Sequence, residues 1–256
     1  MTQTREPELK IFDDPEQVAR AAAGRVAELA RESIEARGLF TFALAGGSTP
    51  RRVYELLAGD EFRDALDWPN VHVFFGDERA VPANHSDSNF RMANESLLSR
   101  VPVPTQNVHR IEGLGDAVAN ASDYESEMRG LFGDAEWPQL DLVLLGMGDD
   151  GHTASLFPKT AALEERRTWV AANWVEKLGA WRVTLTAPAI NAARFVTFLV
   201  NGAAKAARLR EVLKGEREPA RLPSQLIRPS DGALEWFVDR EAASRLEGIE
   251  VSSSSA

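Results

Sequence analysis

The sequence contains no cysteine among its 256 residues, which excludes disulfides, thiolate metal sites and cysteine nucleophiles. Long apolar runs are also missing, because no stretch approaches the roughly 20 apolar residues that a membrane-spanning helix requires. The first ten residues are polar and carry no apolar signal segment. We therefore expect a cytoplasmic protein that is not inserted in a membrane.

Basic charge is scarce. The chain has 29 Lys and Arg against 39 Asp and Glu, a formal net charge of −10. This balance argues against a broad basic surface for nucleic acid or anionic lipid. An anionic substrate would need a local basic pocket.

The apolar pattern predicts an α/β fold in one domain. Residues 15–37 have apolar positions at helical spacing, after Asp13 and Asp14 as possible caps. The short apolar segments predict strands at 39–45, 71–75, 140–146, 182–186, 194–200 and 234–238. Helical patterns follow the main strands, which favours a mostly parallel sheet covered on both faces, a three-layer arrangement. We expect one domain over residues 1–256, with its core at about 15–245 and a flexible tail at 246–256.

Two polar segments follow predicted strands, and ligands of such sheets bind at the carboxyl ends of the strands. In the first, Gly47, Ser48 and Thr49 precede a helix and could offer backbone N–H groups to a phosphate, with Ser48 or Thr49 as a cap. In the second, Asp77 could orient a histidine and Arg79 could bind phosphate or a developing oxyanion. Downstream, residues 82–88 form a long polar loop that could act as a lid, and Ser88 is the expected cap of the next helix.

The third segment runs from Gly146 to Ser155 and contains the adjacent aspartates Asp149 and Asp150 before His152. Its glycines formally match a dinucleotide fingerprint. However, the aspartates would face a pyrophosphate, and residues 168–173 lack the acid that would bind a ribose. His152 instead lies where a general base could meet substrate. The other three histidines are interpreted as structural.

The fourth segment places Lys205 in the first turn of a helix that follows a strand. A lysine there opposes the helix dipole unless an anion binds, which makes Lys205 a second phosphate ligand candidate. A metal hydrolase remains an alternative, because Asp77, Asp150 and His152 could form a carboxylate and imidazole site. No helical histidine pair or dense acidic cluster supports it, so no metal is expected.

Taken together, these segments resemble the 6-phosphogluconolactonase family, a branch of the glucosamine-6-phosphate deaminase-like superfamily. The resemblance covers about residues 15–245, and its motifs match in order and approximate spacing: Leu-Ala-Gly-Gly-Ser-Thr-Pro at 44–50, Phe-Gly-Asp-Glu-Arg at 75–79, Ser-Asn-Phe at 88–90, Asp-Gly-His-Thr-Ala-Ser-Leu-Phe-Pro at 150–158, and Gly-Ala-Ala-Lys at 202–205.

The resemblance implies a Rossmann-like three-layer fold and hydrolysis of 6-phosphogluconolactone without a cofactor, in the oxidative pentose phosphate pathway. It implies that His152 draws a proton from water while Asp77 orients the imidazole. Arg79 and Lys205 would hold the 6-phosphate, with Gly47, Ser48 and Thr49 adding contacts. Asp150 and Arg182 are further candidates for this site.

Two alternatives remain. A glucosamine-6-phosphate deaminase would carry a glutamate five residues after the histidine, where this sequence has Phe157. A sugar-phosphate sensor would keep the basic residues but would not need His152 or Asp77. The substrate is expected to be a small sugar phosphate, and a monomer is favoured.

Overall fold

The computed structural model describes residues 6–246, so residues 247–256 of the tail expected at 246–256 lie outside the described residues, whereas Leu246 is buried against the core. Nine strands occur within this range: β1 (Glu8–Phe12), β2 (Phe40–Leu44), β3 (Val71–Phe75), β4 (Asp77–Arg79), β5 (Leu142–Gly146), β6 (Val170–Val175), β7 (Ala180–Leu185), β8 (Phe195–Val200) and β9 (Ala233–Asp239). The α-helices are α1 (Pro15–Arg37), α2 (Ser48–Leu57), α3 (Asn89–Ala93), α4 (Ala117–Phe132), α5 (Ala187–Asn191), α6 (Ala206–Lys214) and α7 (Arg240–Ala243). The remaining short helices are of 3-10 type except η3, which is a π-helix: η1 (Arg63–Ala65), η2 (Trp68–Asn70), η3 (Asn94–Leu98), η4 (Thr105–Asn107), η5 (Ala161–Glu164), η6 (Glu176–Leu178), η7 (Ala203–Lys205) and η8 (Pro223–Leu226).

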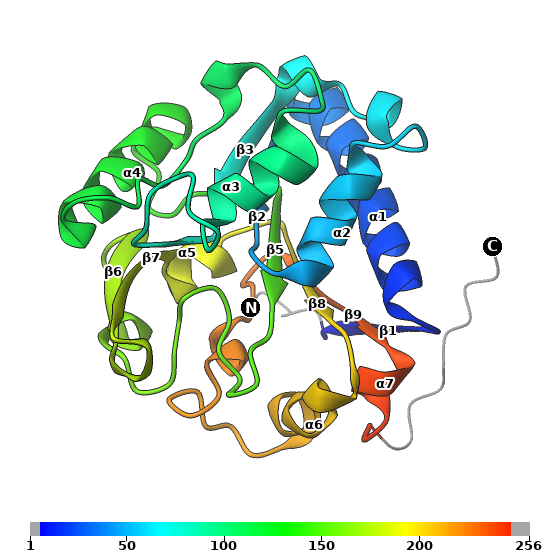
Figure 1. Ribbon diagram of the computed structural model, residues 1–256, viewed down its shortest axis with the longest axis vertical. Helices are drawn as coiled ribbons and strands as arrows, with labels where there is room; N and C mark the ends of the chain where they lie inside the picture. Colours follow the sequence, from blue (N-terminus) through cyan, green and yellow to red (C-terminus); the bar gives the residue numbers. More distant parts are fainter. Residues whose placement is uncertain (1–5, 247–256) are drawn as a thin grey trace.

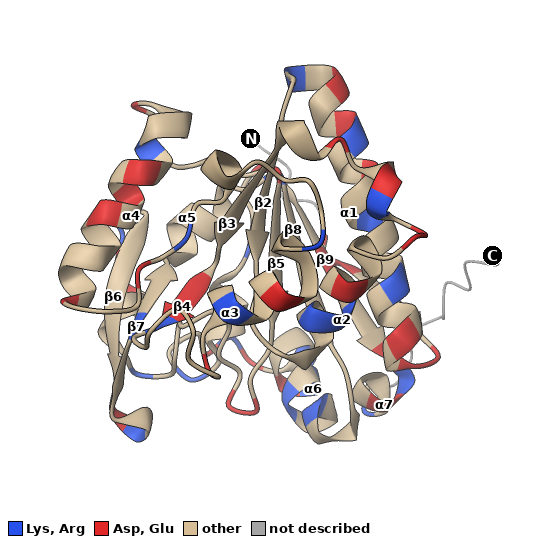
Figure 2. Ribbon diagram, turned by 45° about the horizontal axis from the view of Figure 1, so that its top comes forward, with Lys and Arg blue, Asp and Glu red and all other residues tan. Residues whose placement is uncertain are grey.

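Six strands form a central parallel sheet in the order β1-β9-β8-β5-β2-β3. The helices α1 and α2 lie on one side of this sheet, and α4 lies on the other side with the small sheet that contains β6 and β7 (Figures 1 and 2). The predicted α/β fold with a mostly parallel sheet is therefore confirmed. None of the helices between residues 6 and 246 combines the length and apolar character needed to span a bilayer.

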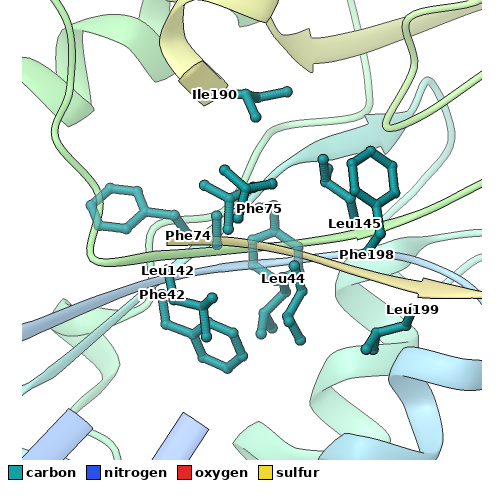
Figure 3. Close-up of a cluster of buried hydrophobic side chains, with 14 of the residues drawn as sticks. Phe42, Leu44, Phe74, Phe75, Leu142, Leu145, Ile190, Phe198 and Leu199 are labelled. Atoms are coloured by element: carbon teal, nitrogen blue, oxygen red, sulfur yellow. The ribbon is translucent and has the colours of Figure 1, made fainter. Parts of the chain in front are cut away.

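Apart from the edge strand β1, the strands of the large sheet are largely buried, because apolar side chains cover both faces. Figure 3 shows this cluster, with Ile190 of α5 above the sheet and Phe42 and Leu199 on the opposite side. These three side chains are at most 2 % exposed. Burial on both faces explains why the strands appear in the sequence as nearly continuous apolar runs.

The opening helix runs over residues 15–37, as predicted, and Asp14 caps it by accepting a hydrogen bond from Gln17 N at 2.9 Å. The predicted strands are present, with ends shifted by up to two residues. Three other strands were not predicted: β1, β4 and β6.

The second sheet is antiparallel, in the order β4-β7-β6, and it changes the environment of residues 77–79. Gly76 joins the two sheets, since its N–H donates to Leu44 O and its carbonyl accepts from Leu185 N. Residues 77–79, for which no strand was predicted, therefore pair through their backbone with β7. Asp77 and Glu78 are buried as a result, at 8 % and 3 % exposure.

Candidate active site

The loops that follow β8, β5, β2 and β3 meet along one edge of the large sheet. These four strands are consecutive neighbours and parallel, so their carboxyl ends share an edge. The edge carries, in that order, Lys205, His152, the turn 47–49 and residues 77–79. The structure therefore gathers the four predicted segments in one region, with the His152 loop at an inner position.

The imidazole of His152 is held by Asp150. The Nδ1 atom of His152 lies 2.6 Å from Asp150 Oδ1, and the backbone N–H of His152 donates to the same oxygen at 3.1 Å. A carboxylate at Nδ1 selects the tautomer with the proton on that nitrogen. No hydrogen bond within residues 6–246 involves Nε2 of His152, which is thus the basic nitrogen that can act on a ligand.

Asp77 does not orient His152, and this expectation is wrong. Its Oδ2 accepts a hydrogen bond from Ser155 Oγ at 2.6 Å, and its Oδ1 accepts from Asn89 Nδ2 at 3.3 Å. Asp77 instead links β4 to α3 and to the end of the loop that carries His152. Its contribution to the site is to hold this loop through Ser155.

Phe157 packs against the catalytic candidate. Its ring stacks on the imidazole of His152 with centroids 4.0 Å apart and planes inclined by 23°. In the sequence, Phe157 stands out only because it occupies the position of the glutamate found in glucosamine-6-phosphate deaminases. The structure adds that Phe157 supports one face of the imidazole, while Asp150 fixes its edge.

Gly148 provides the space for the imidazole. A Cβ at this position would lie 2.0 Å from Nδ1 of His152, whereas a Cβ at Gly146 would meet nothing within 4 Å. Neither glycine has a positive φ, so alanine is free of backbone strain at both. The pair therefore offers a matched test of imidazole placement.

We expect Gly148→Ala to lower kcat at least about tenfold, because the methyl group displaces the imidazole from Asp150. The free energy of unfolding should change by no more than about 1 kcal/mol. Steady-state kinetics and urea unfolding of Gly148→Ala beside Gly146→Ala check this. Equal rates for the two variants would show that the imidazole position seen here is not the active one.

Asp150 carries a strongly stabilised charge. Burial alone would raise its pKa, but the ammonium of Lys177 and the imidazole of His152 outweigh burial and lower the pKa to about 2 from 3.8. Because the pKa falls on folding, this carboxylate stabilises the protein fully above about pH 4. The stabilisation is lost as pH falls from about 4 through about 2.

Asp150→Asn should accordingly destabilise the protein by about 1 to 2 kcal/mol at pH 6. The difference from wild type should shrink as pH falls toward 2. Urea unfolding across this range measures it, with the exposed Asp123→Asn of α4 as control, for which no such trend is expected. A destabilisation that stays constant down to pH 2 would contradict the charged contact.

Arg79 and Arg182 form a pair of cations beside this site. They are directly opposite each other in the β4–β7 register, and no salt bridge within residues 6–246 involves either one. Burial and the charge of Arg79 lower the pKa of Arg182. Arg79 also donates to the carbonyl of Asp87, which anchors the expected lid segment. Two adjacent guanidinium groups without a carboxylate between them form a site suited to an anion.

Glu78, between Asp77 and Arg79, has a structural role that was not predicted. Its carboxylate accepts hydrogen bonds from Ser88 Oγ at 3.0 Å and from the N–H groups of Asn89 and Phe90 at 2.8 Å. Burial raises its pKa even though these bonds oppose the shift. Glu78 thus fixes the start of α3, where Ser88 is the predicted cap and accepts from Arg91 N at 3.1 Å.

Lys205 ends η7 and forms an ion pair with Asp149, whose side chain is 82 % exposed. The turn before it is fixed by Asp239 at the end of β9, whose carboxylate oxygens both accept from Gly202 N at 3.0 Å. Gly202 has a φ of +90°, which a residue with a side chain rarely adopts. Sequence reasoning missed Asp239, because its contact is made only when β8 and β9 pair.

The turn at 47–49 leads directly into α2. Gly47 is its N-cap with no side-chain hydrogen bond, so the expected cap by Ser48 or Thr49 is wrong. The helix begins at Ser48 itself, which leaves its first N–H groups without a side-chain acceptor. Thr49 Oγ1 instead accepts from Asn201 Nδ2 at 3.3 Å. A hollow of about 330 Å³ lies at this point, lined by residues that include Ser48, Thr49, Asn201 and Gly202.

The structure does not assemble the metal alternative. Asp77 bonds to Ser155 and Asn89, whereas Asp150 bonds to His152 and Lys177. Across the described part of the chain, no group of three or more His, Asp or Glu side chains is arranged to hold a metal ion.

The chain is similar in sequence and fold to several known proteins. The profile of the family described as glucosamine-6-phosphate isomerases/6-phosphogluconolactonase matches residues 13–236. A 6-phosphogluconolactonase of Synechocystis sp. is 43 % identical over 218 residues, covering 84 % of this chain and 88 % of that protein. The solved 6-phosphogluconolactonase of Trypanosoma cruzi is 30 % identical with a TM-score of 0.85, covering 96 % of this chain and 99 % of that one. A solved monomeric glucosamine-6-phosphate deaminase, 22 % identical over 93 % of this chain and 99 % of its own, shares the fold with a TM-score of 0.79.

Proposed function

The chain belongs to the glucosamine-6-phosphate isomerase/6-phosphogluconolactonase family, and from that premise we propose that it hydrolyses 6-phosphogluconolactone to 6-phosphogluconate with His152 as general base. The observation that carries this proposal is the short contact between His152 Nδ1 and Asp150, which leaves Nε2 as the basic nitrogen. The product would be 6-phosphogluconate of the pentose phosphate pathway.

The reaction follows from this tautomer. Nε2 of His152 takes a proton from a water molecule as the water oxygen bonds to the lactone carbonyl carbon. The carbonyl oxygen becomes an oxyanion, and the bond from this carbon to the ring oxygen then breaks. The proton on the imidazolium passes to the ring oxygen, which becomes a hydroxyl group, while Asp150 stabilises the imidazolium in between.

The basic residues of the same edge would bind the substrate phosphate. Arg79 and Lys205 supply the charge, with the backbone and hydroxyl groups of Gly47, Ser48 and Thr49 as further donors. Arg182 adds a second guanidinium next to Arg79. Phosphate binding far from the reacting carbon would hold the lactone carbonyl at His152, which lowers the entropic part of the barrier.

The deaminase alternative is disfavoured by Phe157. A stacked phenyl ring can neither carry nor relay a proton, so the glutamate role of that family has no equivalent at this position. The sensor alternative predicts binding without turnover. A lactonase would therefore release an acid, a deaminase would release ammonia, and a sensor would release neither.

The test is to incubate the purified chain, in buffer with a chelator, with 6-phosphogluconolactone formed in situ and separately with glucosamine 6-phosphate. The lactonase predicts acid release above the spontaneous rate and no ammonia. Ammonia from glucosamine 6-phosphate would identify a deaminase. Saturable binding of 6-phosphogluconate without acid release would identify a sensor.

A further inference from the structure

The geometry points to Lys177 as a positioning residue of the same site, one that fixes the carboxylate of Asp150 and, through it, the imidazole of His152. This inference rests on the proposed function. Lys177 lies in η6, the short helix at the tip of the hairpin between β6 and β7, and it is 25 positions from His152 in the sequence. Sequence motifs give no sign of it.

The contact uses the second oxygen of Asp150. Oδ1 faces Nδ1 of His152, and Oδ2 forms an ion pair with Nζ of Lys177. A carboxylate held at one oxygen can rotate about its side-chain bonds, whereas one held at both oxygens cannot. Lys177 therefore limits the directions in which Asp150 can present its charge to the imidazole.

A second contact reaches the same imidazole. Nζ of Lys177 lies 5.2 Å from the centroid of the Phe157 ring, within cation–π distance. The same phenyl ring stacks on His152. One ammonium group thus contacts both neighbours that support the imidazole, the carboxylate at its edge and the aromatic ring on its face.

The β6–β7 hairpin holds Lys177 beside the loop that carries His152. Its strands pair from Val170 with Leu185 to Val175 with Ala180, and Gly179 reverses the chain after η6 with a φ of +56°. Two residue pairs from its tip, Asn173 Nδ2 donates to Ser155 O at 2.8 Å, on the loop that follows His152. The hairpin and the His152 loop are therefore joined independently of the lysine, so its removal need not separate them.

The positive charge of Lys177 should affect the pH dependence of the reaction. The charged groups around His152 come from its own loop, η6, η7 and α6: Asp149, Asp150, Lys177, Lys205 and Arg208. Loss of the Lys177 charge leaves the negative charge of Asp150 uncompensated, which favours the imidazolium. The neutral base would then become available only at higher pH.

The experiment compares Lys177→Met and Lys177→Arg with wild type, and uses Lys214→Met as control because Lys214 is an exposed lysine in the last turn of α6. We expect Lys177→Met to lower kcat about tenfold with KM little changed. The acidic limb of its pH–rate profile should move up by about half a unit. Lys177→Arg should restore most of the rate, since a guanidinium also binds a carboxylate.

Proton NMR of the imidazole signals provides a readout that does not require turnover. The His152 signal is identified by its loss in His152→Gln, and its titration midpoint should rise by about half a unit in Lys177→Met. An unmoved midpoint, or a Lys177→Met enzyme with wild-type kcat, overturns the inference. If wild type hydrolyses no lactone but the midpoint still rises, the proposed function fails and the role of Lys177 stands.

Discussion

Replacing His152 by glutamine is expected to lower kcat by about 10²- to 10⁴-fold, the range that loss of a general base produces. Glutamine can keep a polar contact with Asp150 but cannot accept the proton of the attacking water. KM should stay near the wild-type value, because His152 acts on the reacting carbon and not on the phosphate. The measurement is the steady-state rate of acid release in buffer with a chelator, after subtraction of spontaneous opening.

His72→Gln is the matched control for this experiment. His72 lies in β3, away from the carboxyl edge, and its Nδ1 contacts Nε2 of His109 at 3.1 Å. Its substitution should leave kcat close to wild type. A His152→Gln enzyme that retains more than about a tenth of the wild-type kcat would rule out a general-base role.

Replacing Arg79 by methionine is expected to lower kcat/KM for 6-phosphogluconolactone by roughly 10- to 100-fold, the effect of losing one charged hydrogen bond of about 1.5 to 3 kcal/mol. The loss should appear mainly in KM. Gluconolactone without the phosphate separates a phosphate contact from a catalytic one. If Arg79 binds phosphate, the rate with this second substrate should hardly change.

Arg20→Met serves as control, because Arg20 is an exposed α1 residue that pairs with Glu16 and Glu61. Its kinetics should match wild type with both lactones. Should Arg79→Met reduce turnover of both lactones equally, Arg79 would act at the reacting carbonyl, and phosphate binding would have to come from Lys205 and the turn at 47–49.

Local pattern predicted much of the fold. Apart from the edge strand β1, which carries Glu8 and Lys10, the strands of the large sheet have apolar side chains on both faces, so they form apolar runs that a sequence reveals without an alignment. The strand β4 does not follow this rule, because Asp77, Glu78 and Arg79 are all charged. Its pairing with β7 and the hydrogen bonds that satisfy Glu78 come from residues that are distant in sequence.

The candidate site was only partly predictable. The four segments could be placed at one edge, because parallel strands bring their carboxyl ends together. The choice of Asp77 over Asp150 as partner of His152 was wrong. The signal was nonetheless local, since an aspartate two residues before a histidine can accept from its N–H in an Asx turn, and Asp150 does so.

Lys177 and Asp239 could not be predicted as residues of the site, because no local sequence pattern marks them. Each reaches the site only when a distant element folds beside it: Lys177 through the β6–β7 hairpin and Asp239 through the β8–β9 pairing. Ser155 is intermediate, since it lies in the motif but its bond to Asp77 depends on the second sheet. Contacts of this kind follow from topology and not from spacing in the sequence.

The most direct test of the central claim is the initial rate at which the purified chain opens 6-phosphogluconolactone, measured at several enzyme concentrations in buffer with a chelator. The structure predicts a rate that rises in proportion to enzyme, saturates with lactone and falls by at least about 10²-fold in His152→Gln. A rate that stays at the spontaneous value at every enzyme concentration would contradict the proposed hydrolysis.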